Sequence, residues 1–243
     1  MSDIEFGGAS DKGCVRTNNE DSFGWAPELG LYVLADGMGG ANAGERASQM
    51  AVQTVINAMR TARQFDMPTL VEALESANRQ VLAAAKSDTT LEGMGTTLVA
   101  ALATEEDVQI ASVGDSRAYL IAGDRLSPVT EDQSWVHEVG RVMGLDEATL
   151  KAHPLRHVLT MAIGAGQRLI VNRYTVPWQV GDTLLMCSDG LHGVVPVEDI
   201  ERIVREGLQE RIPLQETCSR LITAAKDNGG PDNITTILLR RTL

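Results

Sequence analysis

Apolar residues recur at helical spacing in two successive stretches of the first half of the chain. Between residues 44 and 64 they fall on one helical face, at Ala47, Met50, Ala51, Val55, Ala58, Met59 and Ala62. The next stretch carries Leu70, Val71, Leu74, Ala77, Val81 and Leu82. Pro68 suits the first turn of this second helix. The pattern predicts two amphipathic helices, and we expect the methionines of the first to fill the core.

Shorter apolar runs predict strands. These runs lie at residues 4–9, 30–35, 96–104, 108–114, 117–122, 169–176, 183–188 and 234–240. Gly123 and Asp124 have the composition of a two-residue hairpin turn, so we expect antiparallel pairing with the strand that begins at Arg125.

Later helical patterns are predicted at 197–207 and 213–227, with shorter ones near 135–142 and 147–152 and a loop at 165–166. Runs of strands interrupted by helix pairs are typical of antiparallel sheets covered by helices, which is an α+β arrangement. No repeat and no Pro/Gly/Ser-rich linker divides the chain, so we expect one domain over residues 1–243.

Composition narrows the class of protein. The chain has 243 residues and a net charge of −12, which disfavours nucleic acid and anionic membranes as partners. No apolar run approaches the roughly 18 residues of a membrane-spanning helix, and the start resembles no secretory signal, so we expect a cytoplasmic protein. The three cysteines, Cys14, Cys187 and Cys218, are too few and too far apart for a disulfide framework, and we expect reduced, mostly buried thiols.

Three strand candidates end in an aspartate that a small residue follows. These aspartates are Asp36, Asp115 and Asp189, and a fourth, Asp232, opens the last predicted strand. Each one alone is more simply read as a turn residue or helix cap. Together they indicate one site, because carboxylates gathered at the ends of neighbouring strands repel one another unless cations neutralise them.

Oxygen ligands of this kind select hard ions such as Mg²⁺ or Mn²⁺, whereas zinc prefers histidine and cysteine. His153 and His157 are spaced as half of a zinc site, but no second pair accompanies them. Gly37, directly after Asp36, leaves room for the backbone to approach an ion. Two divalent ions about 4 Å apart lower the pKa of a shared water enough to make hydroxide, which attacks phosphorus.

Phosphate hydrolysis also needs a cation that holds the phosphate, and Arg16 is the best candidate. Arg16 follows the first predicted strand and lies close in sequence to Glu20 and Asp21. A guanidinium binds two phosphoryl oxygens at once. The alternative is a surface arginine paired with Glu20.

Six motifs resemble those of the bacterial metal-dependent serine/threonine protein phosphatases of the 2C type (PPM family). They occur in the expected order at residues 11–21, 35–40, 95–97, 112–117, 188–191 and 230–235. Any one of these motifs is weak, whereas six in order along nearly the whole chain are specific.

The resemblance implies a four-layer α-β-β-α sandwich, in which two stacked antiparallel sheets are flanked by pairs of helices. It also implies a site for two Mn²⁺ or Mg²⁺ ions at one end of the sandwich. Carried over by position, Asp36 bridges the two ions, the carbonyl of Gly37 binds one of them, and Asp189 and Asp232 complete the set of ligands.

The same resemblance assigns three further residues. Asp21 orients metal-bound water, with Glu20 nearby, and Asp115 helps to hold a third, weaker ion. Arg16 binds the substrate phosphate, so the residues expected to act in catalysis are Arg16, Asp21 and Asp36.

Two positions depart from the family pattern. Bacterial relatives often carry histidine where Ala41 stands, and animal relatives carry one where Met38 stands. A serine leaving group benefits from a general acid, about 10²–10⁴-fold in rate, so the proton source is open. The candidates are water held by Asp21 or Asp115, His192 and His153.

Residues 131–168, which we call the flap, resemble the substrate-side segment of the family only loosely. The flap reads Asp132-Gln133-Ser134 where Asp-His-Ser is usual, and we expect substrate choice to lie there.

The expected function is hydrolysis of phosphoserine and phosphothreonine in proteins, reversing the action of a cognate bacterial kinase, by a monomeric enzyme. The alternatives are a phosphatase that prefers phosphotyrosine or small phosphoesters, and a non-catalytic relative that binds phosphoproteins. Such a relative would normally have lost Asp36, Asp189 or Asp232, and all three are present.

Overall fold

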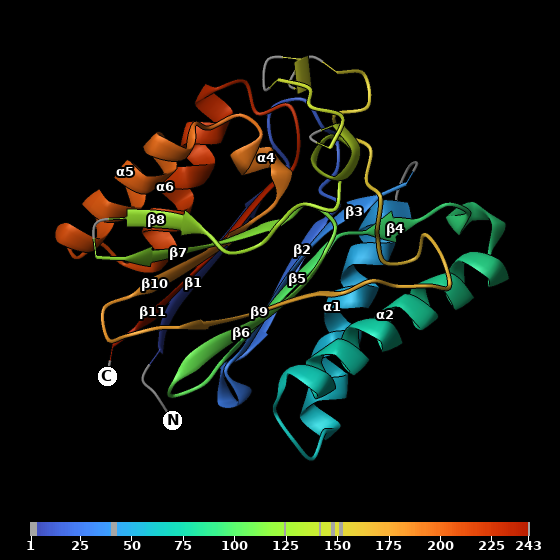
Figure 1. Ribbon diagram of the computed structural model, residues 1–243, viewed down its shortest axis with the longest axis horizontal. Helices are drawn as coiled ribbons and strands as arrows, with labels where there is room; N and C mark the ends of the chain where they lie inside the picture. The colour runs from blue at the N-terminus through green and yellow to red at the C-terminus, as the bar shows by residue number, and fades with distance from the viewer. Residues whose placement is uncertain are drawn as a thin grey trace.

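Two antiparallel sheets lie face to face in the computed structural model, which describes residues 4–39, 43–123, 125–140, 142–146, 149–150 and 153–242 (Figure 1). The first sheet has the strand order β1 (Ile4–Asp11), β11 (Ile234–Arg241), β10 (Thr183–Cys187), β7 (Arg117–Ala122) and β8 (Arg125–Pro128). The second has the order β2 (Asp21–Ala26), β3 (Leu31–Met38), β5 (Leu98–Ala103), β6 (Asp107–Val113) and β9 (Asn172–Pro177), and β4 (Gly95–Thr96) pairs with β3.

Helix pairs cover the outer faces of the sandwich. Figure 1 shows α1 (Ala43–Thr61) and α2 (Met67–Ser87) beside the second sheet. It shows α5 (Val197–Gln209) and α6 (Leu214–Asp227) beside the first sheet, and the one-turn helix α4 (Asp189–His192) follows β10. Shorter turns are η1 (Pro27–Leu29), η2 (Thr89–Leu91) and η3 (Val136–Gly140). The predicted four-layer sandwich is confirmed.

Three apolar layers fill the spaces between the two sheets and the two layers of helices. Strand β3 serves two of them, because Leu31 and Val33 pack toward α1 and α2 while Tyr32 and Leu34 pack between the sheets. Side chains alternate along a strand, so a strand that is buried on both faces reads as a continuous apolar run. The third layer lies between the first sheet and the helices α5 and α6.

The predicted helices agree with the structure to within a few residues, and Pro68 lies in the first turn of α2 as expected. Met59 is fully buried in the core, as expected for the first helix. Cys187 and Cys218 are buried free thiols, whereas Cys14 is an exposed free thiol. None of the described helices is long and apolar enough to cross a lipid bilayer.

Four strand predictions need correction. Strand β2 was not predicted at all, because its Asp-Ser-Phe-Gly-Trp-Ala sequence has only a weak alternation and depends on pairing with β3. The run at 96–104 is broken at Thr97, whose backbone N–H and hydroxyl both bond to Asp36. Strand β9 begins at Asn172 and not at residue 169. Strand β11 begins at Ile234 as predicted, so Asp232 lies two residues before this strand and does not open it.

The flap departs from regular structure. Its first helical pattern forms a single π-helical turn, η3. The second pattern, at 147–152, lies mostly outside the described residues, as do Asp124 of the hairpin turn and Ala41.

Candidate metal centre

Pairing between β2 and β3 brings the first two carboxylates together. Asp21 lies directly opposite Asp36 in the register of these strands. The backbone of Asp36 is held by Thr97, since Thr97 N–H donates to the Asp36 carbonyl at 2.8 Å and Asp36 N–H donates to Thr97 Oγ1 at 3.0 Å. Thr96 Oγ1 donates to the same carbonyl at 2.8 Å. These bonds satisfy the main chain and leave the Asp36 carboxylate free to face its neighbours.

Three more strand ends bring the remaining carboxylates to the same place. Asp115 follows β6, Asp189 follows β10 by two residues, and Asp232 precedes β11. The charges of Asp21, Asp189, Asp115 and Asp232 all act on Asp36. We call these five aspartates the acid cluster. The sequence prediction that they converge is therefore supported by their mutual electrostatic influence.

Burial and like charge raise the pKa values of Asp36, Asp21, Asp115 and Asp189. Burial, followed by the neighbouring carboxylates, raises the pKa of Asp36 well above its ordinary value. Burial likewise raises the pKa of Asp21 and of Asp115 to about 7 in each case. Burial and the charge of Asp232 raise the pKa of Asp189. The charged forms of these four carboxylates are thus disfavoured, and a bound cation would relieve that cost.

Asp21 is held in one orientation by two hydroxyl groups. Thr235 Oγ1 donates to Asp21 Oδ2 at 2.6 Å, and Ser188 Oγ donates to the same oxygen at 2.9 Å. The side chain is only 8% exposed, and its other oxygen, Oδ1, is buried without a hydrogen-bond partner among the described residues. A buried carboxylate oxygen without a partner is costly unless a ligand binds it.

Arg16 contacts the acid cluster from the rim. Its Nη2 donates to Asp232 Oδ2 at 2.8 Å, and its side chain is 51% exposed. Among the described residues the ion-pair partner of Arg16 is Asp232 and not Glu20, which accepts a bond from Asn18. Arg16 therefore stands at the rim of the site with about half of its side chain exposed.

The donor set fits hard divalent cations. It consists of carboxylate oxygens and the backbone of Gly37, with one orphaned buried oxygen on Asp21. Within the described ranges, no three acidic, histidine or cysteine side chains already surround a single point. The coordination is thus not preformed, and the accumulated charge is what indicates cations.

His192, one of the two histidines considered as a proton source, is not poised to donate. It is partly buried, its Nε2 lies 3.0 Å from the Asp115 carbonyl, and burial lowers its pKa to about 4. It is therefore neutral at physiological pH and serves to hold Asp115. The ring of His153 stacks on Trp135 with centroids 4.3 Å apart, and its Nδ1 accepts a bond from Leu155 N–H.

Several residues within the six motifs support the site in ways that the sequence does not indicate. Ser188 and Thr235 position Asp21, and Thr97 positions Asp36. Asn233 joins the loops that carry Arg16 and Asp232, because its amide bonds the carbonyls of Lys12 and Asn18. In the sequence, these residues stand out only because they lie close to the motif aspartates. The hydrogen-bond partner of each hydroxyl is evident only from the three-dimensional structure.

The flap is fastened beside the acid cluster at its first residues. Arg117 forms a two-bond ion pair with Asp132 at 2.7 and 2.8 Å. Gln133 Oε1 accepts from Gly114 N–H at 2.9 Å, directly before Asp115, and its Nε2 donates to the Ile170 carbonyl at 3.0 Å. Gln133 thus fills the place of the family's usual histidine with a buried amide that joins three segments.

Comparisons with known proteins identify the family. The model of the protein phosphatase 2C family matches residues 15–238. A serine/threonine phosphatase, stp, of Listeria innocua is 38% identical over 243 residues, covering 96% of this chain and 94% of its own. The serine/threonine protein phosphatase PstP of Mycobacterium tuberculosis is 34% identical over 97% of this chain and 44% of its own length.

Solved structures give the same assignment. The crystal structure of M. tuberculosis PstP matches with a TM-score of 0.89 and 31% identity, covering 99% of each chain. A structure of the PstP catalytic domain in complex with two manganese ions matches with a TM-score of 0.86 over 99% of each chain. The chain therefore belongs to the protein phosphatase 2C family and is a phosphoprotein phosphatase.

Proposed function

We propose that this chain is a metal-dependent phosphatase that hydrolyses phosphoserine and phosphothreonine in proteins. The observation that carries the proposal is the acid cluster, in which burial and neighbouring carboxylates raise the pKa values of Asp21 and Asp36 and in which Arg16 pairs with Asp232 at the rim. Two relatives that cover nearly all of this chain are named as serine/threonine phosphatases.

In this proposal the ligands of two Mn²⁺ or Mg²⁺ ions are Asp36, the Gly37 carbonyl, Asp189 and Asp232. Asp115, with Asp21 nearby, would hold a third ion. Bound divalent cations supply a hydroxide nucleophile at neutral pH and offset the charge that develops on the phosphoryl oxygens.

The chain's own residues orient the reaction. Asp21 is fixed through one oxygen by Ser188 and Thr235, so its free Oδ1 is available to accept a hydrogen bond from water. Arg16, which already reaches Asp232, would bind the phosphoryl oxygens and place phosphorus over the acid cluster. Gln133 keeps Gly114, and hence Asp115, in position.

We further propose that residues 1–243 form one catalytic domain whose flap contacts the substrate. The natural substrates would be phosphoproteins modified by a serine/threonine kinase of the same cytoplasm, and the enzyme would act as a monomer. Two buried free thiols, Cys187 and Cys218, are consistent with a reducing compartment.

Phosphate release from a phosphothreonine peptide tests the proposal. We expect release that EDTA abolishes and Mn²⁺ restores, with phosphothreonine and phosphoserine peptides preferred over phosphotyrosine peptides and p-nitrophenyl phosphate. Preference for either of the last two would favour the alternative specificity. Binding of the phosphopeptide without turnover under these conditions would identify a non-catalytic relative.

A further inference from the structure

Strand β2 has an open edge. Because the Gly37 N–H donates to the Glu20 carbonyl, the alternation of an antiparallel pair turns the backbone groups of Ser22 and Gly24 toward β3. The backbone N–H and C=O groups of Phe23 and Trp25 therefore point away from the sheet. Within the described residues, these outward groups have no hydrogen-bond partner.

The edge strand of the first sheet that lies on the same side, β1, is blocked. The Gln215 side chain makes both bonds that a neighbouring strand would make to Gly8, accepting from its N–H at 3.1 Å and donating to its carbonyl at 2.8 Å. A free edge invites pairing with other chains, and proteins usually block it in such ways.

The other two edges also carry blocking features. On β8 the Leu126 N–H is taken by Glu201 Oε2 at 3.2 Å, and the strand ends at Pro128. Strand β9 carries an exposed Arg173 and ends at Pro177. Charges and prolines discourage strand addition. Strand β2 has neither after Asp21, so its free edge is an exception within this molecule.

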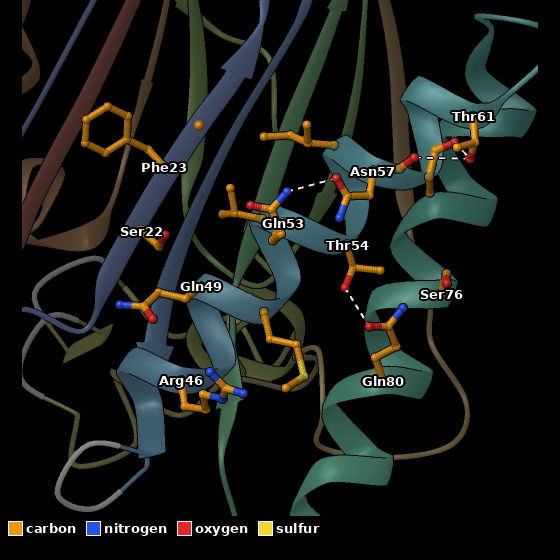
Figure 2. Close-up of a pocket in the computed structure, with 15 residues that line it drawn as sticks. Ser22, Phe23, Arg46, Gln49, Gln53, Thr54, Asn57, Thr61, Ser76 and Gln80 are labelled. Atoms are coloured by element: carbon orange, nitrogen blue, oxygen red, sulfur yellow. Dashed lines mark hydrogen bonds between the residues drawn. The ribbon is translucent and has the colours of Figure 1, made fainter.

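A hollow of about 940 Å³ lies beside β2, over α1 and the adjacent part of α2 (Figure 2). In Figure 2, Gln49 and Gln53 lie on the side of α1 nearer Ser22, whereas the Phe23 ring lies on the far side of β2. Amide side chains both donate and accept hydrogen bonds, so they suit the main chain of an extended peptide. Among the described residues that line the hollow, Arg46 is the charged one.

We propose that the open edge of β2 and this hollow bind an extended segment of the phosphoprotein substrate as an added strand. The proposal rests on the phosphatase function proposed above. Strand β2 begins at Asp21 of the acid cluster, so a segment paired with Phe23 and Trp25 lies about 7–14 Å along the strand from that residue. The docked strand is thus continuous with the reaction site.

Charge and hydrogen bonding both suit this occupant. Arg46 lies in the first turn of α1, where Gly44 packs against Gly37 of the site, so it would attract acidic residues near the phosphate. Main-chain hydrogen bonds at a strand edge give affinity with little demand on side-chain sequence. We therefore expect the edge to recognise an extended backbone more than a particular motif.

A proline substitution tests the edge directly. Trp25→Pro removes the outward N–H and leaves pairing with β3 intact, and Trp25→Ala is the matched control that loses the ring but keeps the N–H. For a phosphothreonine peptide with about eight residues on each side of the phosphothreonine, we expect Trp25→Pro to raise KM about three- to tenfold over Trp25→Ala. Turnover of p-nitrophenyl phosphate should be the same in both. Equal KM values for the long peptide would overturn the proposal.

Hydrogen exchange of the wild-type protein gives a second test that does not depend on the variants folding. A saturating unphosphorylated long peptide should slow exchange of the Phe23 and Trp25 amides at least about tenfold and leave Ser22 and Gly24, already bonded to β3, unchanged. Unchanged exchange at Phe23 and Trp25 would contradict strand addition. A concentration-dependent dimer that Trp25→Pro dissociates would assign the edge to a second copy and would also overturn it.

Loss of the proposed function would look different. A wild-type enzyme that hydrolyses neither the long peptide nor p-nitrophenyl phosphate would refute the phosphatase proposal. Hydrolysis with equal KM for the two Trp25 variants would refute strand docking alone.

Discussion

The acid cluster and the flap meet at the same end of the molecule but are held in different ways. Asp36 and Asp21 sit on paired strands, and their backbones or carboxylates are fixed by Thr97, Ser188 and Thr235. The described flap residues join the sandwich through bonds near Gln133, through one isolated bridge between Thr96 and Ile163, and through bonds from Asn78 to the backbone of Gly164 and Gly166.

The flap also leaves large apolar side chains in solvent, with Val142 85% and Met143 66% exposed. The difference shows where this protein places chemistry and where it places recognition. Ligands on strand ends cannot move without disturbing the sheets, which suits groups that must hold cations at fixed separations. A segment with little regular structure and with exposed apolar side chains suits contact with varied partners.

The largest effect should come from the acid cluster itself. Asp36→Asn removes one negative charge from the centre of the cluster and should lower kcat at least about 10³-fold toward every phosphate ester. Burial and neighbouring carboxylates raise the pKa of Asp36, so removing this charge should raise the Tm of the metal-free protein at pH 7.5. Assays of both variant and wild type at saturating Mn²⁺ check this. Full activity in Asp36→Asn would remove that residue from the site.

A smaller effect on activity should come from substitution of Arg16 at the rim of the acid cluster. Arg16→Ala should raise KM about 10- to 100-fold with less change in kcat, because a charge-assisted pair to phosphate acts in the ground state as well. Arg16→Lys keeps the charge but cannot bind two phosphoryl oxygens at once, so its KM should lie between those of the wild type and Arg16→Ala. Steady-state kinetics on one phosphothreonine peptide suffice, and an unaltered KM would make Arg16 a structural partner of Asp232 only.

A substitution at Gln133, which joins the flap to the segment before Asp115, should distinguish the contribution of the flap from that of the acid cluster. Gln133→Leu leaves the Gly114 N–H and the Ile170 carbonyl without their partner, and we expect KM for a phosphopeptide to rise about three- to tenfold. Gln133→His restores the residue usual in the family and should recover most of the loss. If p-nitrophenyl phosphate hydrolysis fell as far as peptide hydrolysis, Gln133 would act through the acid cluster and not through the flap.

The smallest effect on activity should come from a change at His192. This change tests whether the His192 ring is buried in its neutral form beside Asp115. Its folded pKa of about 4 lies below the ordinary value of 6.5, so its stabilising contribution is complete above pH 6.5 and is lost as the pH falls toward 4. Between pH 7 and 4, wild type should lose up to about 3 kcal/mol more unfolding free energy than His192→Gln. Urea titrations in EDTA at several pH values measure the difference. Parallel profiles would show that His192 is not buried in its neutral form.

The sequence predicted that Asp36, Asp115 and Asp189 stand at strand ends because these ends follow from the apolar runs. Asp36 and Asp189 each follow a run whose burial on both faces makes it unmistakable. Strand β2 escaped prediction because Phe23 and Trp25 alone do not make a run, and its strand conformation comes from pairing with β3.

The hydrogen-bond partners of the polar side chains around the acid cluster could not be predicted from the sequence. The hydroxyl of Thr235 reaches Asp21 across 214 residues, and only the three-dimensional fold joins them. The flap was equally unreadable, because η3 and its surroundings follow no regular period.

Direct measurement of Mn²⁺ binding tests the central claim. Calorimetric titration of the wild-type protein at pH 7.5 should show two ions bound per chain, and Asp36→Asn should lose at least one of them while keeping its fold by circular dichroism. If wild type bound no Mn²⁺, or if Asp36→Asn bound the same number of ions with the same affinity, the acid cluster would not be a metal centre.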